Sequence, residues 1–184
     1  YLYGRSFFLK DQKIAPQHQV VFNYWVSQAK KHWLKIDHRQ SQAHLAIALK
    51  RVDEMKSAEA IMASIKERSV SDDEMGMYWR DTERSWWWYR APIETQAMMI
   101  EAFDEVSNDQ QSVEDCKVWM LKQKQTQDWK TTKATADAVY SLLLRGSDLL
   151  ASNEIVEVDL AGKPAKRREI EAGTGTGLSK MIEN

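Results

Sequence analysis

The chain has 184 residues, and its 26 Lys and Arg against 27 Asp and Glu give a formal net charge of -1. This balance gives no electrostatic reason to expect a nucleic-acid or acidic-membrane partner. A hydrophobic content of 43% indicates a folded domain, and no apolar run reaches the roughly 20 residues that a membrane-spanning helix needs. The single cysteine, Cys116, excludes an internal disulfide and a multi-cysteine metal cluster.

The low content of helix breakers, 3 Pro and 7 Gly, predicts long helices rather than a fold of many strands and turns. Because the sequence starts at Tyr1 and not at Met, we expect a processed product or an excised piece of a longer protein.

Three helices are predicted in the first third of the chain. Pro16 is placed to begin the first, and apolar residues every three or four positions predict one buried stripe on an outer helix. That stripe consists of Val21, Trp25, Ala29, Trp33 and Ile36. Residues 41–52 are apolar nearly all round, which predicts a buried inner helix. Ser57 is predicted to cap another outer helix, with Ala58, Ile61, Met62 and Ile65 on its apolar face.

Residues 70–91 interrupt this pattern with charged and aromatic side chains, and we predict a long irregular crossing that contains a short hairpin. Its aromatic residues could form an interaction surface or pack as a lid, and we favour a mixed role because neighbours alternate sides in an extended segment. The candidate surface residues are Tyr78, Trp79, Trp86, Trp87, Trp88 and Tyr89.

Three more helices are predicted after the crossing. Pro92 opens a largely buried helix, and Ser112 begins a capping-box-like start of an outer one. Thr131 or Thr132 is predicted to cap a last inner helix, which Gly146 ends. Apolar residues cover all sides of this last helix: Ala134, Ala136, Ala138, Val139, Tyr140, Leu142, Leu143 and Leu144.

A weak internal repeat relates the two halves. Ser41-Gln42-Ala43 corresponds to Thr95-Gln96-Ala97 at an offset of 54 residues, and Ser57 corresponds to Ser112 at an offset of 55 residues. Alternating inner and outer helices predict a mainly α fold for residues 1–150, either a solenoid or a partial α/α toroid. Residues 151–184 are predicted to form an extended tail, with a short strand at Ile155, Val156 and Val158 and a turn at Gly162-Lys163-Pro164.

Three stretches give the chain a family resemblance, sharpest between residues 77 and 146. They are Pro92-Ile93-Glu94-Thr95-Gln96-Ala97, then Trp119-Met120-Leu121-Lys122-Gln123-Lys124-Gln125, then Trp129-Lys130-Thr131-Thr132-Lys133-Ala134-Thr135-Ala136-Asp137-Ala138-Val139-Tyr140. Residues 2–150 resemble the later part of the thioester-type domain in bacterial alpha-2-macroglobulin proteins. The aromatic runs Met77-Tyr78-Trp79 and Trp86-Trp87-Trp88-Tyr89 resemble members of that family from the Bacteroides group. The tail resembles the re-entry into the flanking β domain of those proteins.

The resemblance implies a module of a cell-envelope or periplasmic protease inhibitor that traps its target after a bait segment is cut. The expected partners are target proteases, through the full-length parent, and the flanking β domain of the same chain. The Cys-Gly-Glu-Gln thioester motif of the family is absent, and Cys116 in an apolar helix is expected to be a packing residue. We therefore predict no enzyme activity and no catalytic, cofactor-binding or metal-binding residue in this chain.

The rival hypothesis is a carbohydrate-active enzyme or glycan-binding domain, because glycosidases also use helical toroids with paired acids. Its candidate carboxylates are Asp81, Glu83, Glu94 and Asp137. At the start of a helix, Glu94 and Asp137 are also favoured by the helix dipole alone. His32, His38 and His44 are six residues apart, which does not suit a metal site on a helix. An incomplete ring would expose an apolar flank, so we also expect the chain to associate with itself or to leave a terminal helix loosely packed.

Overall fold

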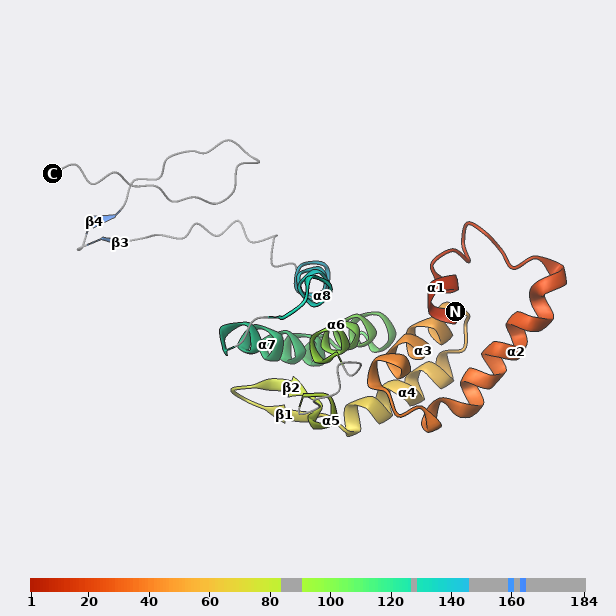
Figure 1. Cartoon of the computed structure of the whole chain (residues 1–184), viewed down its shortest axis with the longest axis horizontal. Coiled ribbons are helices and arrows are strands. Elements are labelled where there is room, and N and C mark those ends of the chain that lie inside the picture. The colour runs from red at the N-terminus through yellow and green to blue at the C-terminus, as the bar shows by residue number, and fades with distance from the viewer. Residues whose placement is uncertain (84–90, 127–128, 146–158, 161–162, 165–184) are drawn as a thin grey trace. The chain divides into compact units, whose positions relative to one another are not determined.

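The computed structural model describes residues 1–83, 91–126, 129–145, 159–160 and 163–164. The chain divides into two units, Tyr1–Leu150 and Ala151–Asn184, and the described part of the first is mainly helical (Figure 1). The elements of the first unit, in chain order, are α1 (Leu2–Ser6), α2 (Pro16–His32), the 3-10 turn η1 (Trp33–Lys35), α3 (Arg39–Arg51), α4 (Met55–Glu67), β1 (Val70–Asp72), β2 (Gly76–Tyr78), α5 (Arg80–Glu83), α6 (Pro92–Ala102), the π-helix η3 (Phe103–Ser107), α7 (Gln110–Thr126) and α8 (Thr132–Leu144).

Helices α3, α6 and α8 form a row in which α6 packs against both of the others (Figure 1). Helix α4 packs on α3, and α7 packs on α6. One residue from each member of the row, Ala46, Met99 and Ala138, has no exposed surface. The prediction that α3 and α6 are inner helices is therefore confirmed by their burial, because small and apolar side chains around them let neighbours approach from several sides.

Helix α8 is covered on one face only, contrary to the prediction that it is buried all round. Ala134 and Ala138 are buried, whereas Val139, Tyr140 and Leu144 are 43%, 46% and 64% exposed. Among the described elements, α6 is the main neighbour of α8, so the opposite face of α8 meets solvent.

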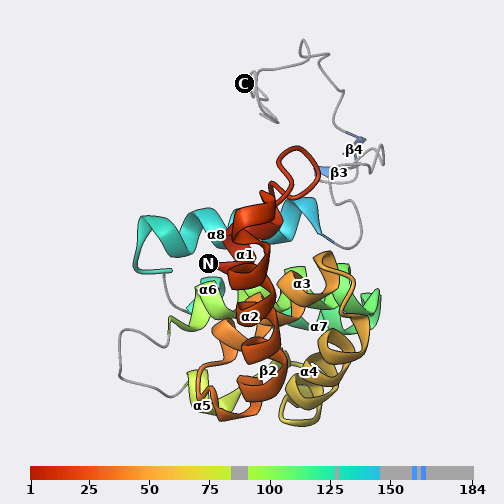
Figure 2. The same ribbon diagram turned by 90° about the vertical axis from the view of Figure 1, so that its right-hand side faces the viewer.

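Helix α2 begins at Pro16, as predicted, but buries only part of the predicted stripe. Ala29 is buried as predicted, together with Phe22 and Val26, which the prediction did not include. Val21 and Trp25, which the sequence placed on the buried side, are 55% and 50% exposed. Apolar residues lie on two sides of this helix, and packing against the rest of the unit decides which side is buried. Figure 2 views α2 from the outside of the unit.

The helix caps match the sequence in part. The prediction for Ser57 is wrong, since α4 begins before it. The prediction for Ser112 is wrong as well: Asp109 accepts hydrogen bonds from the Ser112 N–H at 3.2 Å and from its hydroxyl at 2.7 Å. The prediction for Thr131 is confirmed, because its Oγ1 accepts the Ala134 N–H at 3.0 Å.

The crossing contains the predicted hairpin, in which β1 and β2 pair antiparallel with Val70 opposite Tyr78 and Asp72 opposite Gly76. Gly76 has a φ of 74° and lies against α7: a Cβ at this position would be 2.2 Å from the Asp115 carbonyl oxygen. Only glycine permits this close approach with a left-handed backbone.

In the second unit, β3 (Asp159–Leu160) pairs antiparallel with β4 (Lys163–Pro164). Lys163 and Pro164 are therefore strand residues and not part of a turn, which corrects the prediction for them. The other predicted features of the tail lie outside the described residues, as does the helix end at Gly146: Ile155, Val156, Val158 and Gly162.

Candidate functional site

One residue of the aromatic surface predicted for the crossing lies in the core instead. Trp79 is 1% exposed, its indole N–H donates to the Ile65 carbonyl at 2.9 Å, and its ring stacks on Phe103. The prediction that Trp79 contributes to an exposed surface is therefore wrong. Tyr78 is half-buried and stacks on Trp119 with a centroid distance of 6.3 Å. The remaining candidates lie outside the described residues: Trp86, Trp87, Trp88 and Tyr89.

The carboxylates of the glycosidase hypothesis are not brought together around a cavity. Asp81 pairs with Arg39 at 3.1 Å, and Asp137 pairs with Lys133 one turn away on α8. Glu94 lies in the first turn of α6, where the helix dipole favours it. None of these three residues lines either of the two grooves described below. The side chain of the fourth acid lies outside the described residues: Glu83.

The densest polar arrangement among the described residues lies where the C-terminal ends of the row helices meet α1, and sequence reasoning missed it. Its centre is Glu101, a buried carboxylate on α6 that is 6% exposed. We call this arrangement the Glu101 cluster; its members are Tyr3, Arg51, Glu101, Asp104, Glu105 and Arg145.

Two guanidinium groups pair with the three acids of the Glu101 cluster. Arg51 makes a two-pronged bond to Glu105, with Nε and Nη2 both 2.6 Å from its carboxylate oxygens. Arg51 and Arg145 also approach Glu101 Oε1 at 3.4 Å and 3.3 Å. The Tyr3 hydroxyl donates to the same carboxylate at 3.2 Å. A buried acid with these partners is satisfied as an anion and suits structural cross-linking better than proton transfer.

The pKa shifts in the cluster follow from these contacts. Burial, reinforced by the negative charge of Glu101, raises the pKa of Tyr3 well above its usual range. Burial opposes the charge of Arg51, but hydrogen bonds and attraction from Glu105 and then Glu101 raise its pKa. Arg145 behaves in the same way, with Glu101 as its main anionic partner. Each raised pKa favours the protonated side chain of Tyr3, Arg51 or Arg145, which is the form that bonds to the carboxylates of the cluster.

The internal repeat is the signal that could have found this cluster. Arg51 and Glu105 are 54 residues apart, which is the offset that relates the two inner helices. Opposite charges at equivalent positions of neighbouring inner helices can pair directly. Gln42 and Gln96 show the same equivalence: each is buried, and each amide donates to two main-chain carbonyls.

Gln96 ties three elements together. Its Nε2 donates to the Met77 carbonyl at 2.7 Å and to the Cys116 carbonyl at 3.2 Å, which links α6 to β2 and α7. Gln42 donates to the Ile36 carbonyl at 3.0 Å, which links α3 to the segment that follows α2. Such bonds give the amide groups of the two buried glutamines the hydrogen-bond partners that water would otherwise supply.

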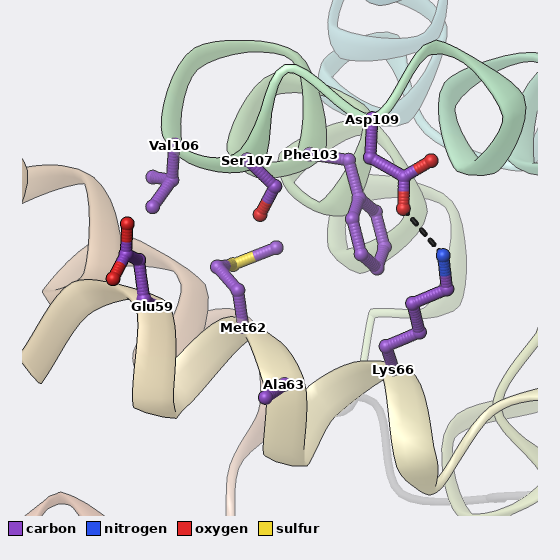
Figure 3. Close-up of a pocket in the computed structure, with 8 residues that line it drawn as sticks. All are labelled: Glu59, Met62, Ala63, Lys66, Phe103, Val106, Ser107 and Asp109. Carbon is purple, nitrogen blue, oxygen red and sulfur yellow. Dashed lines mark hydrogen bonds and ion pairs between the residues drawn. The ribbon is translucent and has the colours of Figure 1, made fainter. Parts of the chain in front are cut away.

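A shallow groove runs between α4 and the π-helix η3 (Figure 3). Its volume is about 290 Å³, and the Lys66–Asp109 ion pair, 2.5 Å long, closes one end. The apolar lining residues Met62, Phe103 and Val106 are themselves at most 6% exposed. The volume lies at the lower end of the range of about 300–1,000 Å³ that is typical of small-molecule sites.

A second groove of about 580 Å³ lies beside the N-terminus of α8. Trp129 is 8% exposed, and Lys124 Nζ lies 5.3 Å from its ring centroid. The indole face is thus covered and is not free to stack on a sugar ring, which weakens a glycan-binding interpretation. The lining residues are Lys124, Trp129, Lys130, Thr131, Thr132, Thr135, Ala136 and Val139.

Cys116 and His44 are both removed from solvent, whereas His38 caps α3 by accepting the Ser41 N–H. Cys116 is fully buried, and burial raises the pKa of its thiol well above the ordinary value, so it is held as a neutral thiol. Burial, then the charge of His38, lowers the pKa of His44 to about 4. Within the described ranges, no group of three or more His, Cys, Asp or Glu could hold a metal ion. No helix in the same ranges is long and apolar enough to cross a bilayer.

No protein-family model matches this chain, and neither does any curated protein sequence.

Proposed function

We propose that the chain is a structural helical module, a partial α/α toroid, of an alpha-2-macroglobulin-like protease trap. In this proposal it does no chemistry itself. The parent would act in the periplasm or cell envelope on target proteases, and the tail of the chain would lead into a flanking β domain. The two-layer packing of α4 and α7 against the row of α3, α6 and α8 supports this architecture.

One observation carries the proposal: residues in the stretches that resemble the family make the framework contacts of the fold. Pro92 occupies the first turn of α6, and Gln96 ties α6 to β2 and α7. Trp119 is buried in α7, and Thr131 caps α8. Gln96 and Trp119 contact elements that are distant in the sequence, and Pro92 and Thr131 set where helices begin; both roles suit a structural scaffold.

The ion pairs and hydrogen bonds made by the acids support a non-catalytic role. Glu101 is shared by two guanidiniums and a tyrosine hydroxyl, and Asp81 and Asp137 are ion-paired. A general acid or nucleophile needs a free approach to substrate. Glu101 instead links α6 to α1 and α3, Asp81 links α5 to α3, and Asp137 is engaged by Lys133 within α8.

The test uses the full-length protein that contains this chain. It is incubated with active proteases of different specificities, and the products are separated by size under native conditions. We expect one cut in a bait segment and co-elution of the protease with the cleaved parent. Cleavage without retention, or no cleavage by any protease, would contradict the proposal. Variants Glu94→Gln and Asp81→Asn serve as controls: acid-dependent turnover of a glycan would favour the rival enzyme hypothesis.

A further inference from the structure

Helix α2 has an exposed apolar face opposite the one that it buries. The exposed fractions are 78%, 55%, 54% and 50% for Val20, Val21, Tyr24 and Trp25. At 3.6 residues per turn these positions gather on one side of the helix. The Tyr24 and Trp25 rings contact each other edge to face, with centroids 5.4 Å apart. We call these four residues the α2 outer face; Figure 2 looks toward it.

The α2 outer face has the size of a surface patch that is often functional. Aromatic side chains carry about 150–250 Å² each, so half-exposed rings and two exposed valines leave on the order of 400 Å² of apolar surface. Two such faces brought together supply about 800 Å², so flanking polar side chains must supply about 400 Å² more to reach the roughly 1,200 Å² of a stable interface.

We propose that two copies of this chain associate through their α2 outer faces as an antiparallel pair. The proposal concerns the 184-residue chain and does not rest on the protease-trap function. A two-fold pair is self-complementary, because each copy offers the same patch to the other. The midpoint of α2 is Tyr24, so the two-fold axis passes close to this residue.

The charges on α2 favour the antiparallel orientation. The helix has no acidic residue; Lys30, Lys31 and His32 lie in its last turn and His18 in its first, and Lys30 is paired with Glu54 of the same chain. A parallel pair would bring these two basic turns together. In an antiparallel pair, Lys31 of one copy lies opposite the neutral Gln17 of the other, and the helix dipoles oppose each other favourably.

The exposed face of α8 is a poorer partner for α2. It carries Val139, Tyr140 and Leu144, and the Lys133 and Arg145 side chains are each paired with an acid of the same chain. Pairing it with α2 would join unlike surfaces, and such head-to-tail contacts continue into larger rings or filaments instead of closing at two copies.

Sedimentation equilibrium of the chain over a range of micromolar concentrations tests the association. We expect the mass to rise from 21.4 kDa to twice that value and no further. Trp25→Glu should raise the dissociation constant by at least about thirtyfold, as loss of a central aromatic anchor does. The matched control is Leu121→Glu on α7, also half-exposed at 47%, which should change nothing. Val21→Lys is a second variant in case Trp25→Glu lowers the helical circular dichroism.

Disulfide trapping tests the orientation, since native Cys116 is buried. Tyr24→Cys should cross-link to its own counterpart on mild oxidation. Lys31→Cys should not, because the two copies of this residue lie about 20 Å apart along an antiparallel pair. A monomer at every concentration, cross-linking of Lys31→Cys, equal weakening by Leu121→Glu, or growth beyond two copies would each overturn the proposal.

Discussion

Replacing Gly76 by alanine tests the close approach of the hairpin to α7. The new methyl group would lie 2.2 Å from the Asp115 carbonyl oxygen, 2.9 Å from the Trp119 nitrogen and 3.0 Å from Val118 Cβ. Two of these three atoms belong to the backbone of α7 and cannot rotate away, so β2 must move outward. The bond from Gln96 to the Met77 carbonyl then lengthens or breaks.

The cost has two parts. A left-handed backbone costs alanine about 1–2 kcal/mol relative to glycine, and a weakened buried hydrogen bond adds about 1–2 kcal/mol. We therefore expect Gly76→Ala to lower the free energy of unfolding by about 2–4 kcal/mol. With a slope of about 2 kcal/mol per molar urea, the unfolding midpoint falls by about 1–2 M.

The matched control is Gly4→Ala in α1. An alanine Cβ at Gly4 meets nothing within 4 Å, and alanine is the better helix former by about 1 kcal/mol. Urea titration followed by far-ultraviolet circular dichroism should show Gly4→Ala unchanged or slightly stabilised. Equal midpoints for Gly76→Ala and the unsubstituted chain would refute the close packing of β2 on α7.

Three further substitutions probe burial and protonation by the same titration. Trp79→Phe removes the donor to the Ile65 carbonyl and leaves a small cavity, so we expect a loss of about 2–3 kcal/mol; no loss would place Trp79 outside the core. The pKa of His44 falls from 6.5 to about 4 on folding, so the unfolded chain binds more protons below pH 6.5. Stability should therefore drop as the pH falls from 6.5 to 4, by about 1–2 kcal/mol after allowance for solvent screening of this partly exposed ring; a His44→Phe variant with the same pH dependence would contradict this. The raised pKa of Tyr3 means that its neutral hydroxyl stabilises the fold below pH 10 and that this contribution is lost as the pH rises further. Tyr3→Phe should cost about 1 kcal/mol at neutral pH and flatten the alkaline part of the profile; an unchanged profile would exclude the bond to Glu101.

The sequence predicted the burial of α3 and α6 well because it is encoded locally, but it failed for α8, whose outer face has no neighbour among the described elements. The run from Ala43 to Leu49 has no polar face to offer to solvent, whatever the partners are. Helices with two apolar stripes are different: in α2, Val21 and Trp25 are as apolar as Phe22 and Val26, and only the packing of distant elements decides which pair is buried.

The Glu101 cluster was beyond local sequence reasoning for a related reason. Its partners Tyr3, Arg51 and Arg145 are 98, 50 and 44 residues away from Glu101 in the sequence. Within any single helix, the local sequence pattern predicts that such charged residues are exposed to solvent. Trp79 was misassigned because it belongs to an aromatic run, whereas its burial depends on α4, which supplies the Ile65 carbonyl.

The size of substrate that a captured protease can reach tests the proposed function most directly. The full-length protein is saturated with an active protease, and hydrolysis of a short peptide and of a large protein substrate is compared before and after capture. A trap predicts that peptide hydrolysis persists while the rate of hydrolysis of the large substrate falls by at least tenfold. A tenfold change corresponds to a free-energy difference of about 1.4 kcal/mol. Equal loss of both activities, or no loss of either, would contradict the account.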